Sequence, residues 1–244
     1  MDESELYDAI FRRRSVRKYA GPLDHDALTE ICQFTASLRP LFPDIKIGWK
    51  LLGGDGVKGL FKVDAPHFLT IYSEPKKGYL FNAGFMMQQM DLFLSTKEVG
   101  SCWQGGPRPV RKGGASGLKF TISMAFGKPS GEVHRNDLSE FKRRPLSEIT
   151  NVTGMDNVLE PARLAPSAMN NQSWYFTGSN DEINVYWARS AMNGRMNQIN
   201  AGIALCHLWL AAAHEGGYGK IVRDPPKEGA PRKGYEYAAT VLMK

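Results

Sequence analysis

The 244-residue sequence lacks any apolar run near the roughly 18 residues that a membrane-spanning helix requires, and its acidic, polar start is unlike a signal peptide. It is also poor in cysteine: Cys32, Cys102 and Cys206 form neither a CxxC pair nor a cluster with histidine. Such an odd, scattered set indicates neither a disulfide framework nor a zinc site. We therefore expect a cytoplasmic protein with reduced thiols, no bound metal and no membrane association.

The sequence carries a formal net charge of +6, which raises the question of nucleic-acid binding. The basic residues are scattered, however, and the two tightest clusters, residues 12–18 and 142–144, lie far apart in the sequence. Neither cluster has the interleaved aromatic residues that single-strand binders use. Because a phosphate-bearing small molecule needs only a few basic side chains, we expect a small-molecule ligand and no nucleic-acid partner.

One helical pattern occurs twice in the chain. Residues 82–94 begin with Asn-Ala-Gly, have apolar residues at three- and four-residue steps, and are followed by Gly100. The same Asn-Ala-Gly start recurs 118 positions later, in residues 200–210. Each copy of the helix is followed by a strand pattern, at 119–127 after the first and at 235–243 after the second. Both helices are apolar on nearly all sides, so we expect each to be buried and packed against the other.

The repeat predicts an α+β protein made of two tandem helix-plus-sheet halves, equivalent to a dimer fused into one chain. Two further apolar runs, 66–72 and 183–187, predict one more strand in each half. Residues 127–132, which contain two glycines and a proline, are interpreted as a loop near the join. We place the halves at 1–140 and 141–244, closely packed, and expect this pseudo-dimer to be a monomer, with further association left open.

Two segments are rich in basic residues. Residues 12–19 place a serine among arginines, and residues 141–148 place three basic side chains before a proline. Guanidinium groups match phosphate oxygens with fixed pairs of donors, and a serine hydroxyl adds another donor. Taken alone, each segment is more simply explained as a solvated basic turn or linker.

Two other segments are rich in turn-forming residues. Residues 100–107 contain paired glycines, which let a backbone approach a flat ligand and point N–H groups at it. Residues 164–176 combine proline, serine and asparagine, which expose backbone and side-chain donors in a tight loop. The simpler alternatives are a helix C-cap and turn with Trp103 in the core, and an ordinary helix-to-strand turn.

In combination, the four segments resemble those of the nitroreductase family of FMN-dependent oxidoreductases. The family opens with Arg-x-Ser-x-Arg/Lys, matched by residues 13–17, and carries a Gly-x-Cys-Trp-x-Gly-Gly-like turn, matched by 100–106. Its Ala-Pro-Ser-x-x-Asn-x-Gln-Pro-Trp loop is matched by 165–174, with Ser173 in place of the second proline, and its basic Arg-Lys/Arg-Pro-Leu segment by 142–146. The resemblance covers most of the chain and is strongest to the family's single-chain, fused-dimer branch.

The order of these segments differs from the usual one in the family. The Ala-Pro-Ser loop normally follows the opening arginines, but residues 35–40 lack its pattern, and the second half has no Arg-x-Ser-x-Arg. Because the family binds FMN at its dimer interface, the resemblance implies one complete site between the halves. The implied cofactor-binding residues are Arg13, Arg14, Ser15, Arg17, Lys142 and Arg144 at the phosphate, Pro166, Ser167, Ala168, Met169 and Asn170 from the second half, and Trp103, Gln104, Gly105 and Gly106 along the flavin ring.

The resemblance further implies an enzyme in which FMN performs the redox chemistry and no side chain is itself catalytic. The expected reaction is the two-electron reduction of a nitroaromatic, a quinone or an unknown acceptor, with NADH or NADPH as reductant. Two alternatives stay open. One is other flavin chemistry on the same fold, such as dehydrogenation, dehalogenation or fragmentation of the flavin. The other is a diverged flavin-binding or interaction protein without turnover.

Overall fold

The computed structural model describes residues 2–111, 117–217, 219–227 and 230–243. Its elements, in chain order, are α1 (Glu3–Ile10), β1 (Tyr19–Gly21), α2 (His25–Ser37), β2 (Ile47–Gly53), η1 (Gly54–Gly56), β3 (Val57–Lys58), β4 (His67–Ser73), α3 (Tyr79–Thr96), β5 (Gly100–Gln104), β6 (Arg108–Pro109), β7 (Lys119–Pro129), η2 (Leu138–Phe141), α4 (Leu146–Ile149), α5 (Asp156–Arg163), η3 (Ala168–Asn170), β8 (Trp174–Gly178), β9 (Glu182–Ala188), α6 (Gly194–His214), β10 (Lys220–Val222) and β11 (Tyr235–Leu242). None of the helices within these ranges has the length and apolar character that a membrane crossing requires. The mixture of helices and strands confirms the predicted α+β class.

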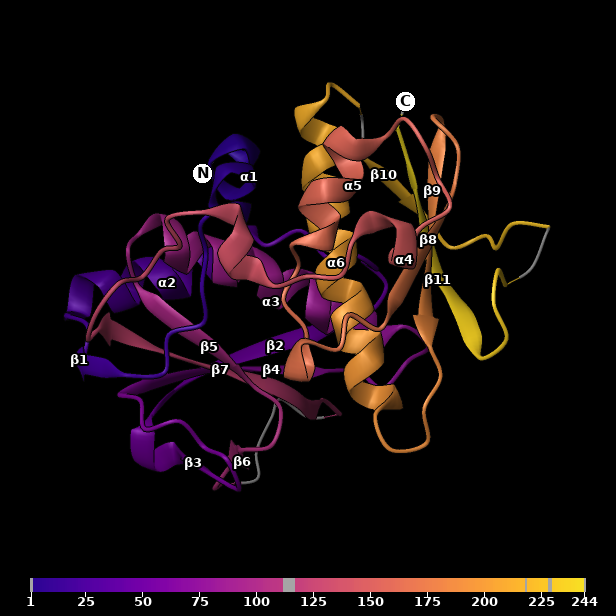
Figure 1. Cartoon of the computed structure of the whole chain (residues 1–244). Coiled ribbons are helices and arrows are strands. Elements are labelled where there is room, and N and C mark those ends of the chain that lie inside the picture. Colours follow the sequence, from indigo (N-terminus) through magenta and orange to yellow (C-terminus); the bar gives the residue numbers. More distant parts are fainter. Residues whose placement is uncertain (1, 112–116, 218, 228–229, 244) are drawn as a thin grey trace.

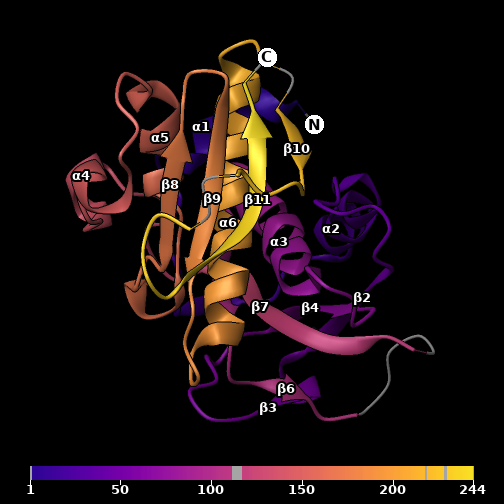
Figure 2. The ribbon, with the colours of Figure 1, turned by 90° about the vertical axis from the view of Figure 1, so that its right-hand side faces the viewer.

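The strands form two antiparallel sheets that flank the central helices α3 and α6 (Figure 1). The first sheet has the order β1-β7-β4-β2, with β5 also paired with β7, and α3 packs on it. The second sheet has the order β10-β11-β9-β8 and covers α6, as Figure 2 shows from the side. Strands β3 and β6 form a separate two-stranded ribbon beyond the first sheet.

The central helices approach each other unusually closely at two glycines. A Cβ added to Gly84 of α3 would overlap the carbonyl oxygen of Ile199, and one added to Gly202 of α6 would overlap the carbonyl oxygen of Phe81. The two contacts are equivalent in the repeat, because Gly202 and Ile199 lie 118 positions after Gly84 and Phe81. The predicted burial of both helices against each other is therefore confirmed, while the internal duplication stays a prediction.

The predicted strands are confirmed, but the loop predicted at 127–132 is wrong for its first three residues. The sequence pattern indicated a loop at 127–132, whereas β7 continues to Pro129 because its last residues pair with β1. The alternative that residues 100–107 form a helix C-cap also fails, since α3 ends at Thr96 and β5 then pairs along β7. The strand begins with Gly100 and is followed by Gly105 and Gly106, so propensity alone does not predict it.

The N-terminal helix α1 positions the arginine-rich segment that follows it. Asp2 caps α1 by accepting a hydrogen bond from the Ser4 N–H at 3.2 Å. Leu6, Ala9 and Ile10 are buried, and α1 packs on both α3 and α6. The chain therefore leaves α1 next to the helix pair, which places residues 12–18 near the middle of the molecule.

His207 joins three helices in the core. Its Nδ1 lies 2.9 Å from the carbonyl oxygen of Pro161 in α5, and its Nε2 lies 3.1 Å from Nε2 of Gln88 in α3. The carbonyl can only accept, so Nδ1 carries the proton and Nε2 accepts from the amide of Gln88. Complete burial lowers the pKa of His207 to about 3, and the ring is neutral in the folded protein.

We expect Gly84→Ala to lower the free energy of unfolding by about 2 kcal/mol or more, because its Cβ meets backbone that cannot move aside. The matched control is Gly131→Ala, where an added Cβ meets nothing within 4 Å. Urea unfolding of both variants measures the difference. Equal stability of the two variants would contradict the close helix approach.

The neutral His207 makes stability depend on pH. The pKa of His207 is about 3 in the folded protein, against 6.5 for an ordinary histidine. Between pH 6.5 and pH 3 this histidine is therefore protonated in the unfolded chain and neutral in the folded protein, so the free energy of unfolding falls as the pH falls. From pH 7 to pH 5, the native protein should lose about 2 kcal/mol more unfolding free energy than His207→Gln. Urea unfolding at both pH values tests this, and parallel pH profiles would exclude a neutral, buried ring.

Candidate functional site

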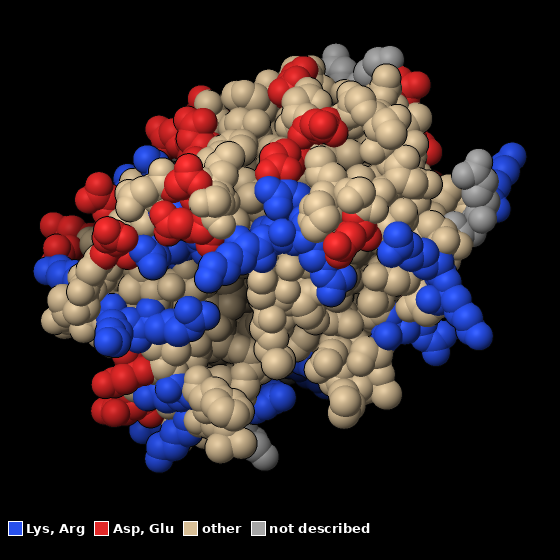
Figure 3. Space-filling model, viewed as in Figure 1, with Lys and Arg blue, Asp and Glu red and all other residues tan. Residues whose placement is uncertain are grey.

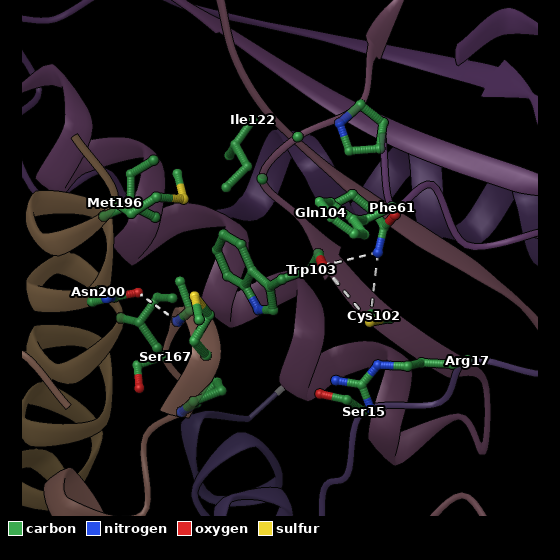
Figure 4. Close-up of a pocket in the computed structure, with 18 residues that line it drawn as sticks. Ser15, Arg17, Phe61, Cys102, Trp103, Gln104, Ile122, Ser167, Met196 and Asn200 are labelled. Atoms are coloured by element: carbon green, nitrogen blue, oxygen red, sulfur yellow. Dashed lines mark hydrogen bonds between the residues drawn. The ribbon is translucent and has the colours of Figure 1, made fainter. Parts of the chain in front are cut away.

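A cavity of about 420 Å³ lies between the two sheets (Figure 4). One wall is formed by β5 and the turn after it, and the other by α6 and the loop before β8. Trp103 projects between Met196 of α6 and the Ser15–Arg17 segment. The apolar side chains that line the cavity are Phe61, Trp103, Pro107, Ile122, Pro166, Ala168, Met169, Met196, Ile199 and Ile203. We call this space the wide cavity.

The wide cavity contains few ionisable groups. Among the described residues that line it, Arg17 is the only charged side chain. Burial raises the pKa of the Cys102 thiol, an effect that Arg17 and Arg13 only partly oppose, so this thiol stays protonated at neutral pH. The buried indole N–H of Trp103 has no hydrogen-bond partner in the described part of the chain. Among the described lining residues, the cavity therefore offers a ligand one cation, but no carboxylate, histidine or thiolate.

The wide cavity opens into a second pocket, of about 400 Å³, that is lined mainly by basic residues. The two share five lining residues, Ser15, Arg17, Pro166, Ser167 and Met169. The charged side chains that line the second pocket are Arg13, Arg14, Arg17, Arg135, Glu140, Lys142 and Arg143. We call it the arginine pocket. Together they form one cleft that is apolar at one end and cationic at the other, and Lys and Arg gather around this hollow in Figure 3.

A buried ion pair holds the arginine-rich segment in place. Arg13 Nε lies 3.0 Å from Asp91 Oδ2, and the two side chains are 1% and 0% exposed. Ser101 of β5 donates to Asp91 Oδ1 at 2.5 Å. The backbone continues the attachment, since the Val16 N–H donates to the Ser101 carbonyl oxygen at 2.8 Å. Arg13 is therefore neutralised inside the protein, and it positions Ser15 and Arg17 instead of carrying a free charge.

Two other arginines at this pocket have no acidic partner. Arg135 donates to the backbone oxygen of Arg13, and Arg143 donates to the carbonyl oxygen of Phe141 at 2.8 Å. In the described ranges, no ion pair joins either side chain to a carboxylate. Burial, and then the repulsion of neighbouring arginines, lowers the pKa of Arg135 to about 10 and that of Arg143 to about 9. An anion bound between Arg135 and Arg143 would stabilise their charged forms and raise both pKa values again.

The loop before β8 closes the cleft from the second sheet. The Asn200 side chain of α6 anchors it by accepting the Ala168 N–H at 3.1 Å. Met169, Asn170 and Gln172 all have positive φ, at 54°, 57° and 47°. Such conformations are unfavourable for residues with a side chain and cluster at functional sites. Asn170 Oδ1 accepts from Arg143 at 2.5 Å, so the loop is bound to the arginine pocket.

The structure brings together all but one of the site residues that the sequence predicts. The wide cavity is lined by Ser15, Arg17, Trp103, Gln104, Gly105, Gly106, Pro166, Ser167, Ala168 and Met169. The arginine pocket adds Arg13, Arg14, Lys142 and Asn170. Arg144 lines neither: its side chain is exposed, and its N–H donates to Gln172 Oε1 at 2.7 Å.

Sequence reasoning missed Arg135, Arg143 and Phe61. Arg143 lies in the basic segment that was singled out, so only the choice of which arginine turns inward was missed. Arg135 and Phe61 stand in no pattern, and only the fold shows that they line the cleft. The string Gly54–Gly59 matches the Gly-x-Gly-x-x-Gly dinucleotide pattern by letter. It leads from η1 into β3 and opens no α-helix, so it lacks the context of that motif.

Several solved structures are similar to this chain. A "putative nitroreductase" from Thermotoga maritima MSB8 has a TM-score of 0.69 and 21% identity, covering 100% of this chain and 95% of that one. A nitroreductase family protein from Clostridium difficile 630 has a TM-score of 0.46 and 17% identity, covering 61% and 96%. An FMN-dependent nitroreductase from Clostridium difficile R20291 has a TM-score of 0.41 and 16% identity, covering 54% and 92%. The first of these likenesses shows a nitroreductase fold.

The sequence comparison gives the family. The family model described as "Putative TM nitroreductase" matches residues 5–212. No curated protein sequence matches this chain. The chain belongs to the TM nitroreductase family, and we assign it to the oxidoreductases.

Replacing Asp91 tests whether the buried ion pair supports the site. Asp91→Asn leaves Arg13 charged and buried without a counter-ion, so we expect a loss of about 3 kcal/mol of unfolding free energy. The control is Glu132→Gln, which removes the partner of the more exposed Arg14 and should cost less than about 1 kcal/mol. Chemical denaturation measures both, and equal losses would exclude a supporting role for the buried pair.

Proposed function

We propose that the protein binds FMN in the cleft and uses NADH or NADPH for two-electron reduction of a nitroaromatic, a quinone or a similar acceptor. The single observation that carries the proposal is the polarity of the cleft. The wide cavity has apolar walls and opens into the arginine pocket. FMN has the same division, because its flat ring system and its phosphate lie at opposite ends of the molecule.

The residues present fit this cofactor. The phosphate would lie among Arg17, Arg135 and Arg143, which have no acidic partner in the described chain. Guanidinium groups bind phosphate through charge-assisted hydrogen bonds. The ring would lie against Trp103, a large aromatic side chain that lines the wide cavity. The paired glycines fit as well, since added Cβ atoms would already crowd Met196 at Gly105 and the Leu60 carbonyl at Gly106.

FMN when bound supplies the transfer of an electron pair as hydride. The chain's own residues hold it, exclude water from its apolar faces and supply positive charge. Arg17, the lone cation at the wide cavity, favours any negative charge that develops there. Among the described residues, no carboxylate, histidine or lysine lines the wide cavity, so protons taken up by an acceptor there would come from water.

We further propose that residues 1–140 and 141–244 act as the two subunits of a pseudo-dimer with a single FMN site. Asn82 accepts the Phe42 N–H at 3.0 Å, just as Asn200 accepts the Ala168 N–H at 3.1 Å. Phe42 therefore occupies the position that corresponds to the Ala-Pro-Ser loop. Its ring is 5% exposed and lies 3.7 Å from the Arg223 guanidinium carbon, so this second position is filled by the chain itself.

Reduction of the loaded protein tests the activity. FMN-loaded protein should lose its visible flavin absorbance under anaerobic addition of NADH or NADPH, and regain it on addition of a quinone or nitroarene. The faster of the two nucleotides identifies the reductant. Bound FMN that neither nucleotide bleaches would refute the oxidoreductase proposal and favour a flavin-binding protein without turnover.

A pair of adjacent arginines tests the position of the phosphate. Arg143→Ala should weaken FMN binding by about 10- to 100-fold, the range for a lost charged hydrogen bond. Arg144→Ala should change it less than about twofold, because Arg144 lies outside the cleft. Fluorescence titration measures both dissociation constants.

Riboflavin binding by the same variant distinguishes loss of a phosphate contact from damage to the loop before β8. Riboflavin lacks the phosphate, so Arg143→Ala should leave riboflavin binding unchanged although Arg143 also bonds to Asn170. An equal loss for FMN and riboflavin would contradict a phosphate at the arginine pocket.

A further inference from the structure

Two neighbouring apolar side chains stand exposed after strand β3. Leu60 is 80% exposed and Phe61 is 94% exposed. Isolated apolar residues on a surface need no explanation, but these two differ in their surroundings. Phe61 lines the wide cavity, and Leu60 does not. Figure 4 shows Phe61 on a different side of Trp103 from Ser167.

The backbone fixes Phe61 at this position. The Val63 N–H donates to Gln104 Oε1 at 3.0 Å, which ties the segment to the end of β5. A Cβ added to Gly59 would lie 2.8 Å from the Cα of Pro107, so the two backbones are in direct contact. The segment that carries Phe61 is therefore held against the glycine turn that lines the cavity.

The backbone conformation of Phe61 is unfavourable, and packing of its side chain within the protein does not compensate for it. Its φ is 57°, in the left-handed region that disfavours bulky residues. The ring is almost wholly exposed, so burial in the protein does not offset this strain. Strain of this kind persists where surrounding structure imposes it and is concentrated where ligands bind.

We propose that Phe61 is a positioning residue that packs on the ring of the electron acceptor in the wide cavity. The inference rests on the proposed function, in which FMN takes the part of the cleft next to Trp103. Phe61 and Met196 both line the wide cavity, and Arg17 is the only charged side chain of the described lining. Aromatic rings attract each other in stacked and edge-to-face geometries. The occupant that fits is a planar, uncharged ring, such as a naphthoquinone, and not a sugar or a polyanion.

Equilibrium binding tests the proposal without turnover. FMN-loaded, oxidised protein is titrated calorimetrically with 2-methyl-1,4-naphthoquinone in the absence of reductant. Phe61→Ala should raise the dissociation constant about fivefold. Leu60→Ala, the matched exposed control, should change it less than about twofold. Phe61→Tyr should restore the native value within about twofold, because it keeps the ring.

Steady-state kinetics give a second readout. Phe61→Ala should raise KM for the naphthoquinone more than it lowers kcat, and it should leave the rate with ferricyanide, which has no ring to stack, unchanged. Equal quinone affinities of Phe61→Ala and Leu60→Ala in FMN-loaded protein would overturn the role of Phe61 alone. Weaker FMN binding by Phe61→Ala would also overturn it, since Phe61 would then contact the cofactor. Native protein that binds no FMN would instead refute the proposed function, and this inference with it.

Discussion

The rest of the structure depends on the close approach of α3 and α6 at Gly84 and Gly202. Each glycine lies against a carbonyl oxygen of the other helix, so no residue with a side chain fits there without moving the backbone. This contact brings the two sheets to opposite sides of one helix pair. The cleft lies where α6 faces the strand that follows α3, and its shape therefore follows from the distance between the helices.

One arginine of the cleft is paired with a carboxylate inside the protein, and in the described chain two others are not. Asp91, a buried residue of α3, neutralises Arg13 and thereby fixes the arginine-rich segment. Arg135 and Arg143 receive no such partner within the described residues, and burial, followed by the repulsion of neighbouring arginines, lowers the pKa of both. Unpaired, half-buried cations cost free energy, and a bound anion would offset that cost. This cost is why a phosphate-bearing cofactor is a better fit than a neutral one.

The sequence was most informative where a pattern repeats or a motif is contiguous. The Asn-Ala-Gly repeat predicted both central helices and their mutual burial, because apolar residues all around a helix require contact on every side. Four separate segments predicted most of the cleft. Strand β5 was hidden, since it begins with a glycine and its pairing with β7 depends on residues that are distant in the sequence.

Single side chains were harder to predict than segments. In the basic segment, Arg143 turns into the cleft and Arg144 turns out, a choice that the backbone at Lys142, with φ of 49°, sets and that composition does not reveal. Arg135 reaches the pocket because residue 134 forms an isolated β-bridge with Arg13, far away in the chain. Phe61 lies in a stretch without periodicity. For Arg135 and Phe61 the decisive contact is between residues that are neighbours only in space.

The central claim is that the two halves of one chain build a single flavin site. The most direct test is a stoichiometric titration of cofactor-free protein with FMN, with bound flavin counted per chain and the association state measured on the same sample. The account predicts saturation at one FMN per chain, because Phe42 and Arg223 fill the second position. Saturation at two FMN per chain, or the absence of saturable binding, would contradict it.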